Sequence, residues 1–330
     1  MNKIELTLAC EQYDRTDALR EGRIEPEGIH LIYLALSPQE TFWRMMRHLD
    51  FDVAETSFAA YIIAKSRGEK RLTAIPVFPS REFRHSAIYI NVNSKISKPS
   101  DLKGKKVGVP EYQLTAVVWA RGVIQNEYGV DPKEMRWFTG GQEEAGREER
   151  IELRKPPGVN IEPIPKGRTL SGMLDEGELD AVMTPLLPSV FARRSPRVRR
   201  LFENFREVEK DFYKRTGVFP IMHTLAMKTS LYEKYPWVSQ SFYKAFSQSR
   251  DEAIKKLYDT NALRITLPWV VAEVEEEAKF LGDDIWPFGV EANRKTIETF
   301  IGYLDQQELL ERPVTIEELF AANTFDMYKT

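Results

Sequence analysis

The sequence predicts an α/β protein of two lobes, each with a mixed sheet flanked by helices, joined by two hinge crossings. Strand and helix signals alternate through the first third of the 330 residues, a turn-rich stretch interrupts them, and the same alternation then repeats. Such alternation favours mostly parallel sheets covered by helices. The length also suits two domains, each with a core of its own.

Lobe 1 opens the chain, and apolar periodicity with cap and turn residues delimits its elements. Ser37 and Pro38 form an N-cap followed by proline at the first helical position, and Gly68 ends the next helix. The turn-rich segment 93–103 marks the first crossing, so 1–92 belongs to this lobe. Its predicted strands cover 4–9, 29–36, 51–54, 72–77 and 87–92, and its helices cover 39–48 and 57–67.

Lobe 2 is predicted over 93–221, and residues 222–330 return to lobe 1. The segment 140–157 is polar and rich in glycine and charge, which is typical of a long functional loop. The return strand is 221–227, and the signal beyond it is mostly helical. Lobe 2 contains predicted strands at 106–109, 135–138, 161–164 and 181–183 and helices at 114–128 and 169–175; helices at 238–257, 272–281 and 294–307 follow the return.

The composition excludes several classes of protein. Hydrophobic residues make up 42%, charged residues 29%, and the net charge is −3, so we expect neither a nucleic-acid partner nor a membrane partner. No apolar run approaches the roughly 20 residues of a membrane helix. Cys10 is the only cysteine, which excludes an intrachain disulfide and a cysteine metal cluster. Gly140 and Gly141 follow no nucleotide-binding pattern, and a homo-oligomer is left open.

The first residues run directly into a strand. They contain no basic n-region, no apolar h-region and no small-residue cleavage site. We therefore expect a cytoplasmic protein.

A ligand of a two-lobed α/β protein lies in the crevice at the carboxyl ends of the strands. The loop 11–15 follows the first strand, and the segments 55–57 and 111–115 each open a helix. Helix starts present free backbone N–H groups, which favour carboxylates and phosphates. Ser57 and Thr115 would add hydroxyl donors. Alternatively, these two hydroxyls and that of Thr56 only cap their helices.

Two histidines lie at the two predicted crossings. His85 follows Arg84 just before the strand 87–92, and His223 lies in the return strand. If both strands form the hinge, both imidazoles approach the cleft, where a pKa of about 6.5 suits proton transfer. Arg84 would clamp a carboxylate with two parallel hydrogen bonds, or instead form a surface ion pair with Glu82.

Segments along nearly the whole chain resemble the 4,5-dihydroxyphthalate decarboxylase family. The most specific are Arg84-His85-Ser86, Pro110-Glu111-Tyr112-Gln113 and Pro220-Ile221-Met222-His223. The resemblance implies the periplasmic-binding-protein type II fold, conversion of 4,5-dihydroxyphthalate to 3,4-dihydroxybenzoate, and no organic cofactor. The segments that carry it are 8–10, 13–15, 83–89, 108–115, 119–122, 140–141, 147–150, 177–181 and 219–224.

The implied chemistry defines what the site must contain. Direct loss of CO2 would leave an unstable aryl carbanion, whereas a deprotonated hydroxyl para to the carboxylate lets an acid protonate the ring carbon first. The site then needs a base, an acid and a cationic anchor for the second carboxylate. His85 and His223 are the candidates for acid and base, in either order. Glu111 is an alternative acid, because a closed apolar cleft raises the pKa of a carboxyl group.

The candidate substrate-binding residues surround these groups, and no metal is required. Arg84 and the helix start at 112–115 would hold the retained carboxylate, and the loop arginines would close over it. The loop after the first strand would reach the hydroxyl edge. The full set is Arg84, Tyr13, Asp14, Arg15, Thr56, Ser57, Tyr112, Gln113, Thr115, Arg147 and Arg150.

Two other functions use the same fold. A solute receptor of the ABC-transporter type for a small carboxylate would need the same anchors without proton transfer. A biosynthetic enzyme such as the thiamin pyrimidine synthases is similar in architecture only. Those enzymes carry a cysteine-rich iron segment, and the single Cys10 argues against that class.

Overall fold

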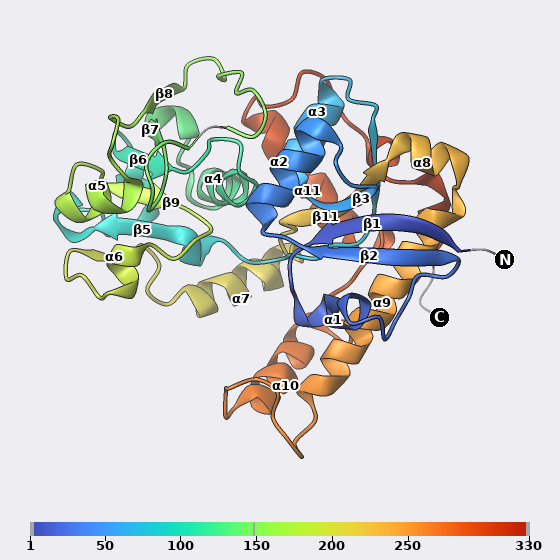
Figure 1. Cartoon of the computed structure of the whole chain (residues 1–330). Helices are drawn as coiled ribbons and strands as arrows, with labels where there is room; N and C mark the ends of the chain where they lie inside the picture. The colour runs from blue at the N-terminus through green and yellow to red at the C-terminus, as the bar shows by residue number, and fades with distance from the viewer. Residues whose placement is uncertain (1–2, 148, 328–330) are drawn as a thin grey trace.

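The computed structural model describes residues 3–147 and 149–327 and contains two mixed sheets. The strand order is β2-β1-β3-β11-β4 in the first sheet and β10-β5-β9-β6-β7-β8 in the second. Figure 1 shows the two sheets in separate halves of the molecule, each with helices against it. The predicted two-lobed α/β architecture is therefore confirmed.

The first sheet brings the return strand against an early strand of the chain. β1 pairs in parallel with β2 and β3, whereas β11 runs antiparallel between β3 and β4. In this register His223 lies opposite Ser57, at the carboxyl end of β3. The strands are β1 (Ile4–Cys10), β2 (Ile29–Ala35), β3 (Val53–Ser57), β4 (Leu72–Ile75) and β11 (His223–Lys228).

The second sheet includes a strand that the sequence assigned to lobe 1. β5 runs antiparallel between β9 and β10, and Tyr89 packs with Leu170 and Val182 in an apolar cluster of this half. The boundary at residue 92 is therefore too late, and we propose that the first crossing lies between β4 and β5. The strands are β5 (Ile88–Asn91), β6 (Lys106–Val109), β7 (Arg136–Thr139), β8 (Asn160–Pro163), β9 (Ala181–Met183) and β10 (Val198–Arg200).

The long helices begin and end close to the predicted limits. Ser37 caps α2 by accepting a hydrogen bond from the backbone N–H of Glu40, with Pro38 at the first helical position. These helices are α2 (Pro38–His48), α3 (Phe58–Ser66), α4 (Thr115–Tyr128), α5 (Leu170–Glu176), α9 (Trp237–Leu257), α10 (Val270–Leu281) and α11 (Arg294–Gln306).

Helix α7 (Phe205–Thr216) was not predicted, although its pattern is regular. Phe205, Val208 and Phe212 recur at helical spacing, and Gly217 ends the helix with a φ of 66°. Four short helices were also missed: α1 (Asp17–Arg20), α6 (Ser189–Ala192), α8 (Thr229–Lys234) and α12 (Ile316–Leu319).

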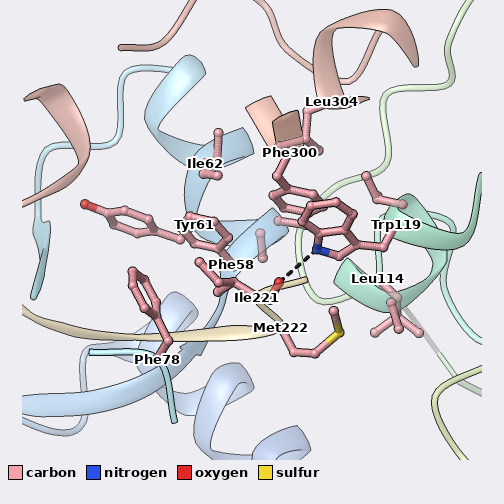
Figure 2. Packing of buried hydrophobic residues seen from close by; sticks show 14 of the residues in the cluster. Phe58, Tyr61, Ile62, Phe78, Leu114, Trp119, Ile221, Met222, Phe300 and Leu304 are labelled. Atoms are coloured by element: carbon pink, nitrogen blue, oxygen red, sulfur yellow. Dashed lines mark hydrogen bonds between the residues drawn. The ribbon is translucent and has the colours of Figure 1, made fainter. Parts of the chain in front are cut away.

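The two halves share one apolar core instead of meeting only at a hinge. The ring of Phe300 in α11 stacks on Phe58 of α3 and on Trp119 of α4, with ring centroids 5.5 and 4.7 Å apart. Trp119 Nε1 also donates a hydrogen bond of 2.9 Å to the backbone carbonyl of Ile221, just before β11 (Figure 2). The first turns of α4 are thereby held close to the residues that lead into the return strand β11.

The predicted loop lies against the first half. Residues 140–159 form no helix or strand in the part that the structure describes. Arg47 of α2 donates hydrogen bonds to the backbone carbonyls of Glu149 and Arg150. Among the described residues, none of the helices has the length and apolar character needed to span a bilayer.

Candidate functional site

A small cavity lies where the two halves meet. Its volume is about 180 Å³, and we call it the seam cavity. Phe42, Leu114, Pro185, Leu186 and Met222 give it apolar walls. Its polar lining comes from both halves and from the crossings, and it comprises Gln39, Ser57, Glu82, Arg84, Thr115, Arg150 and His223.

His223 is the one histidine in this lining. Its Nδ1 lies 2.6 Å from Oε1 of Glu55, and its ring meets the Phe42 ring edge-on, with centroids 4.8 Å apart. β11 and β3 are adjacent antiparallel strands, so the sheet register itself brings imidazole and carboxylate together. With Nδ1 held by Glu55, Nε2 is the nitrogen left for a ligand.

Glu55 is fully buried behind His223 and is held by several donors. The Tyr13 hydroxyl donates to Oε1 at 2.7 Å, and the backbone N–H of Glu11 donates to Oε2 at 3.0 Å. Burial alone would raise the pKa of Glu55, but His223 and these donors bring that pKa below its ordinary value. Burial and Glu55 raise the pKa of Tyr13, so its hydroxyl stays a donor. An ionised Glu55 can therefore orient His223 and stabilise it when protonated.

His85 does not share this environment, contrary to the sequence prediction. It is 2% exposed and meets the rings of Tyr128, Phe202 and Phe212 edge-on, outside the seam cavity. Burial, with a smaller effect of Arg215, lowers its pKa to about 4. The reason is that β5 pairs within the second sheet, so that His85, just before β5, packs among the aromatic side chains of that half.

Arg84 lines the seam cavity, as predicted, and already has a partner. It is 5% exposed, and its Nη1 lies 2.9 Å from Oε2 of Glu82, which also lines the cavity. Its Nε donates to the sulfur of Met222 at 3.1 Å. The ion pair with Glu82, considered from the sequence as an alternative to ligand binding, is thus present, and it joins a buried guanidinium to a carboxylate whose side chain is 57% exposed.

Arg150 also lines the seam cavity, whereas Glu111 and Arg147 lie beside it. Arg147 donates to Oε1 of Glu111 through Nε and Nη2, at 2.8 and 2.6 Å. The backbone N–H of Arg150 donates to Oε2 of Glu111, and its guanidinium lies over the Phe42 ring, 5.0 Å from the centroid. Glu111, predicted as an alternative acid, therefore holds the loop that carries Arg150.

A larger hollow of about 690 Å³ adjoins the seam cavity. The two share Gln39, Arg150 and Leu186, and Glu111 and Arg147 line only the larger one. Burial and the neighbouring Glu111 raise the pKa of Glu149 to about 7. Residues 141–147 line the larger hollow together with Arg150, so the loop that supplies Arg150 forms one of its walls.

Two hydroxyls join the halves at the edge of the seam cavity. Ser57 Oγ and Thr115 Oγ1 are 2.9 Å apart, and Thr115 Oγ1 accepts a hydrogen bond from the backbone N–H of Ala59. Ser57 also caps α3. For Ser57 the two predicted functions, cap and cavity lining, therefore occur together. Thr115 lines the cavity but does not cap α4, because it is the first helical residue and its hydroxyl bonds to α3 instead.

Other predicted cleft residues lie elsewhere. Thr56 is fully buried within β3, and the ring of Tyr112 packs between Trp137 and the guanidinium of Arg121. The side chain of Gln113 is hydrogen-bonded to the loop at 149–152. The side chains of Thr56 and Tyr112 are thus buried within their own halves. That of Gln113 instead links the loop to Arg67, at the end of α3.

The loop after β1 also differs from its prediction. Asp14 lines a separate hollow, and the guanidinium of Arg15 lies between the rings of Tyr13 and Trp286. Of the three predicted residues, only Tyr13 connects to the seam cavity, indirectly through Glu55.

Sequence reasoning did not select Glu55 or Phe42 as site residues, and it considered Glu82 only as the ion-pair partner of Arg84. Glu55 is a charged residue inside an otherwise uncharged buried strand, and such a residue needs a partner. The sequence therefore indicates that Glu55 needs a partner, but it does not identify His223 as that partner. In the described part of the chain, no group of three or more His, Cys, Asp or Glu side chains is arranged to hold a metal ion.

The architecture matches that of solute-binding proteins. The periplasmic aliphatic sulphonate binding protein SsuA from Escherichia coli aligns with a TM-score of 0.54 and 15% identity, covering 98% of this chain and 99% of that one. The MOPS-bound alkanesulfonate-binding protein SsuA from Xanthomonas axonopodis pv. citri gives 0.54, with 12% identity and 98% of each chain. Residues 27–147 match the family described as ABC transporter, phosphonate, periplasmic substrate-binding protein.

Two curated relatives are far more similar to this chain in sequence than these solute-binding proteins are. A 4,5-dihydroxyphthalate decarboxylase of Comamonas testosteroni is 38% identical over 329 residues, covering 100% of both chains. Another, of Pseudomonas putida, is 42% identical over 214 residues, covering 65% of this chain and 83% of that one. The chain belongs to the 4,5-dihydroxyphthalate decarboxylase family, as its sequence segments suggested.

Proposed function

We propose that this protein decarboxylates 4,5-dihydroxyphthalate to 3,4-dihydroxybenzoate in the seam cavity. The observation that carries the proposal is the combination of His223, backed by the buried Glu55, with the guanidiniums of Arg84 and Arg150 in one enclosed space. Buried guanidiniums suit an aromatic acid that carries carboxylates and hydroxyls, and an imidazole suits proton transfer. The full-length relationship to the family supports the same substrate.

The reaction needs one proton delivered to the ring. The hydroxyl para to the departing carboxylate loses its proton. Protonated His223 is the candidate donor of the proton that the ring carbon receives, through Nε2. Protonation of the ring carbon gives a dienone; the bond to the carboxylate then breaks, CO2 leaves and the electron pair restores the aromatic ring. The phenolate takes back a proton, so that one proton from solvent is consumed in each turnover.

The size of the cavity favours a single ring. Its volume of about 180 Å³ is below the roughly 300–1,000 Å³ of pockets for drug-sized ligands. Phe42, Leu186 and Met222 supply flat apolar contacts for an aromatic face. Arg84, Arg150 and Glu55 are buried, which strengthens their interactions with a ligand.

The test is direct measurement of CO2 from carboxyl-labelled substrate. With 4,5-dihydroxyphthalate we expect labelled CO2 and 3,4-dihydroxybenzoate in equal amounts. The matched control is 4,5-dimethoxyphthalate, which has the same carboxylates but no hydroxyl proton to lose, and we expect no CO2 from it. Binding of the substrate without CO2 release between pH 5 and 9 would refute the proposal.

A non-catalytic receptor for a small anion is the second candidate. The observations in its favour are the match to the phosphonate-binding family and the shared fold with the SsuA proteins. Phthalate binding without turnover of any hydroxylated phthalate would favour this function. The third class considered, a thiamin pyrimidine synthase-like enzyme, gains no support.

Three further predictions remain to be tested. We propose a cytoplasmic location, which cell fractionation of the native organism would examine. Cofactor independence would be examined by activity after dialysis against chelator. Sedimentation would establish whether the protein forms a homo-oligomer.

A further inference from the structure

The two guanidiniums of the seam cavity differ in how their charges are compensated. Arg84 and Arg150 are 5% and 8% exposed, so both are buried to a similar degree. Their partners are not similar, and a ligand with two unlike ends would meet this difference directly.

Arg84 forms an ion pair with Glu82, whose side chain is 57% exposed. Glu82 Oε2 lies 2.9 Å from its Nη1, and both side chains line the cavity. The pair presents a donor and an acceptor side by side with no net charge. A phenolic hydroxyl, which donates one hydrogen bond and accepts others, matches such a pair.

The charge of Arg150 is only partly compensated by neighbouring carboxylates. The nearby Glu111 is already engaged by two hydrogen bonds from Arg147, and its closest approach to the Arg150 guanidinium is 3.5 Å. Among the described residues, the Arg150 guanidinium donates no hydrogen bond; its other contact is the face of Phe42. Glu111 is shared by two arginines, and burial with Glu111 raises the pKa of the nearby Glu149 to about 7. With Glu149 protonated, the group keeps a net positive charge, which matches a carboxylate.

His223 and Arg150 lie around the same aromatic ring. The imidazole meets the edge of Phe42, and the guanidinium lies over its face. A carboxylate held by Arg150 would therefore bring the adjacent ring carbon toward His223. The hydroxyls of the substrate, which lie opposite its carboxylates on the substrate ring, would face Arg84 and Glu82.

We propose that Arg150 anchors the carboxylate that the substrate retains, while the Arg84–Glu82 pair binds the hydroxyl edge. This assignment rests on the proposed function and refines it: the required substrate is an aromatic 1,2-dicarboxylate with a hydroxyl para to the carboxylate that leaves. The departing carboxylate then has no guanidinium bound to it, so neither arginine stabilises its ground state.

Each proton in the reaction then has a defined place. Glu82 accepts the proton of the para hydroxyl, and Arg84 stabilises the phenolate. His223, in its protonated form, gives a proton to the ring carbon, and the bond from that carbon to the carboxylate breaks with release of CO2. Glu82 returns its proton to the phenolate, and solvent reprotonates His223.

One consequence is that the reaction stops after one CO2. The product 3,4-dihydroxybenzoate still has a hydroxyl para to its carboxylate. However, that carboxylate is the one held by Arg150, and the carbon facing His223 now bears hydrogen. We expect the wild-type protein to release no CO2 from 3,4-dihydroxybenzoate.

The experiment separates the two ends of the ligand with two probes. Phthalate has only the carboxylates and catechol only the hydroxyls, and calorimetric titration measures their binding without turnover. Arg150→Met should weaken phthalate binding about 10–100-fold, the value of a charged hydrogen-bonded pair, and change catechol binding less than about 2-fold. Arg150→Lys should restore most of the phthalate affinity. Glu82→Gln and Arg84→Met should weaken catechol binding about 3–10-fold and leave phthalate binding largely unchanged.

Arg136→Met serves as the control, since Arg136 stacks over Phe138 on the exposed face of the second half. A phthalate loss in Arg84→Met but not in Arg150→Met would overturn the assignment, as would equal losses of both probes in Arg150→Met. CO2 release from 3,4-dihydroxybenzoate by the wild-type protein would also overturn it, whatever the variants do. Probe binding as expected with no CO2 from 4,5-dihydroxyphthalate would refute the proposed function; only the binding of carboxylates by Arg150 and of hydroxyls by the Arg84–Glu82 pair would then stand.

Discussion

His223 and His85 have the same side chain and opposite surroundings. His223 contacts a buried carboxylate through Nδ1 and lines a cavity. His85 lies among three aromatic rings, and its Nδ1 has no hydrogen-bond partner among the described residues; Glu209 Oε1 is 3.9 Å away. The first can exchange a proton with a ligand, and the second is held neutral.

The difference shows what makes a histidine suitable for catalysis. Position at a crossing between the halves is common to both residues, so position alone does not decide. A histidine can take part in proton transfer when a carboxylate binds one ring nitrogen and the other faces a cavity. The carboxylate orients the ring and stabilises its charged form. The predictions below test this contrast, beginning with the largest effect.

Replacing each histidine should affect turnover very differently. We expect His223→Gln to lower kcat about 10²–10⁴-fold, the usual contribution of general acid–base catalysis. His85→Phe, which keeps the aromatic packing, should retain kcat within about 2-fold. Initial rates of CO2 release at saturating 4,5-dihydroxyphthalate measure both. A comparable loss in both variants would remove the contrast.

His85 should instead determine how stability depends on pH. Its pKa is about 4 in the folded chain, against an ordinary value of 6.5. Between these values the unfolded chain binds a proton that the folded chain does not, so the stability due to neutral His85 is complete above pH 6.5 and is lost as pH falls toward 4. The loss amounts to about 3 kcal/mol.

Urea unfolding at pH 7, 6, 5 and 4 should therefore show a steeper acid loss in the wild type than in His85→Phe. His30→Gln is the control, because His30 is exposed. Parallel wild-type and His85→Phe curves would show that His85 is accessible to protons in the folded state.

Glu55 should matter only through His223. Glu55→Gln keeps the shape but removes the charge that stabilises protonated His223, and the loss of a charged hydrogen bond is worth about 1.5–3 kcal/mol. We expect kcat to fall about 10–100-fold with KM little changed and the pH profile of kcat shifted to lower pH. A rise in KM alone would instead indicate that Glu55 acts on substrate binding.

The smallest effect is expected at the contact between the halves. Thr115→Val keeps the volume but leaves Ser57 Oγ and the N–H of Ala59 without this partner, at a cost of about 1 kcal/mol. Thermal unfolding should show a drop in Tm of about 1–2 °C. An unchanged Tm would mean that solvent replaces the hydroxyl. Ser94→Ala, a hydroxyl that bonds only within its own half, is the comparison.

The sequence predicted the long elements well because their signals are local. Ser37, Pro38 and Gly68 delimit helices within a few residues of themselves. The strand at 88–91 was found, yet its sheet was not, since pairing with β9 joins segments about 90 residues apart. For the same reason Thr56 and Tyr112 were placed in the cleft: a strand end locates a residue but not the direction of its side chain.

The sequence by itself determined the α/β architecture, the family, and the inclusion of His223, Arg84 and Arg150 in a short set of candidates. Only the tertiary structure decided that His223 and not His85 faces the cavity, and that Glu55 stands behind it. His223 and Glu55 are separated by 168 positions and meet through the antiparallel pairing of β11 with β3. Local patterns report backbone preference and burial, whereas the partner and solvent access of a titratable group depend on segments that only folding brings together.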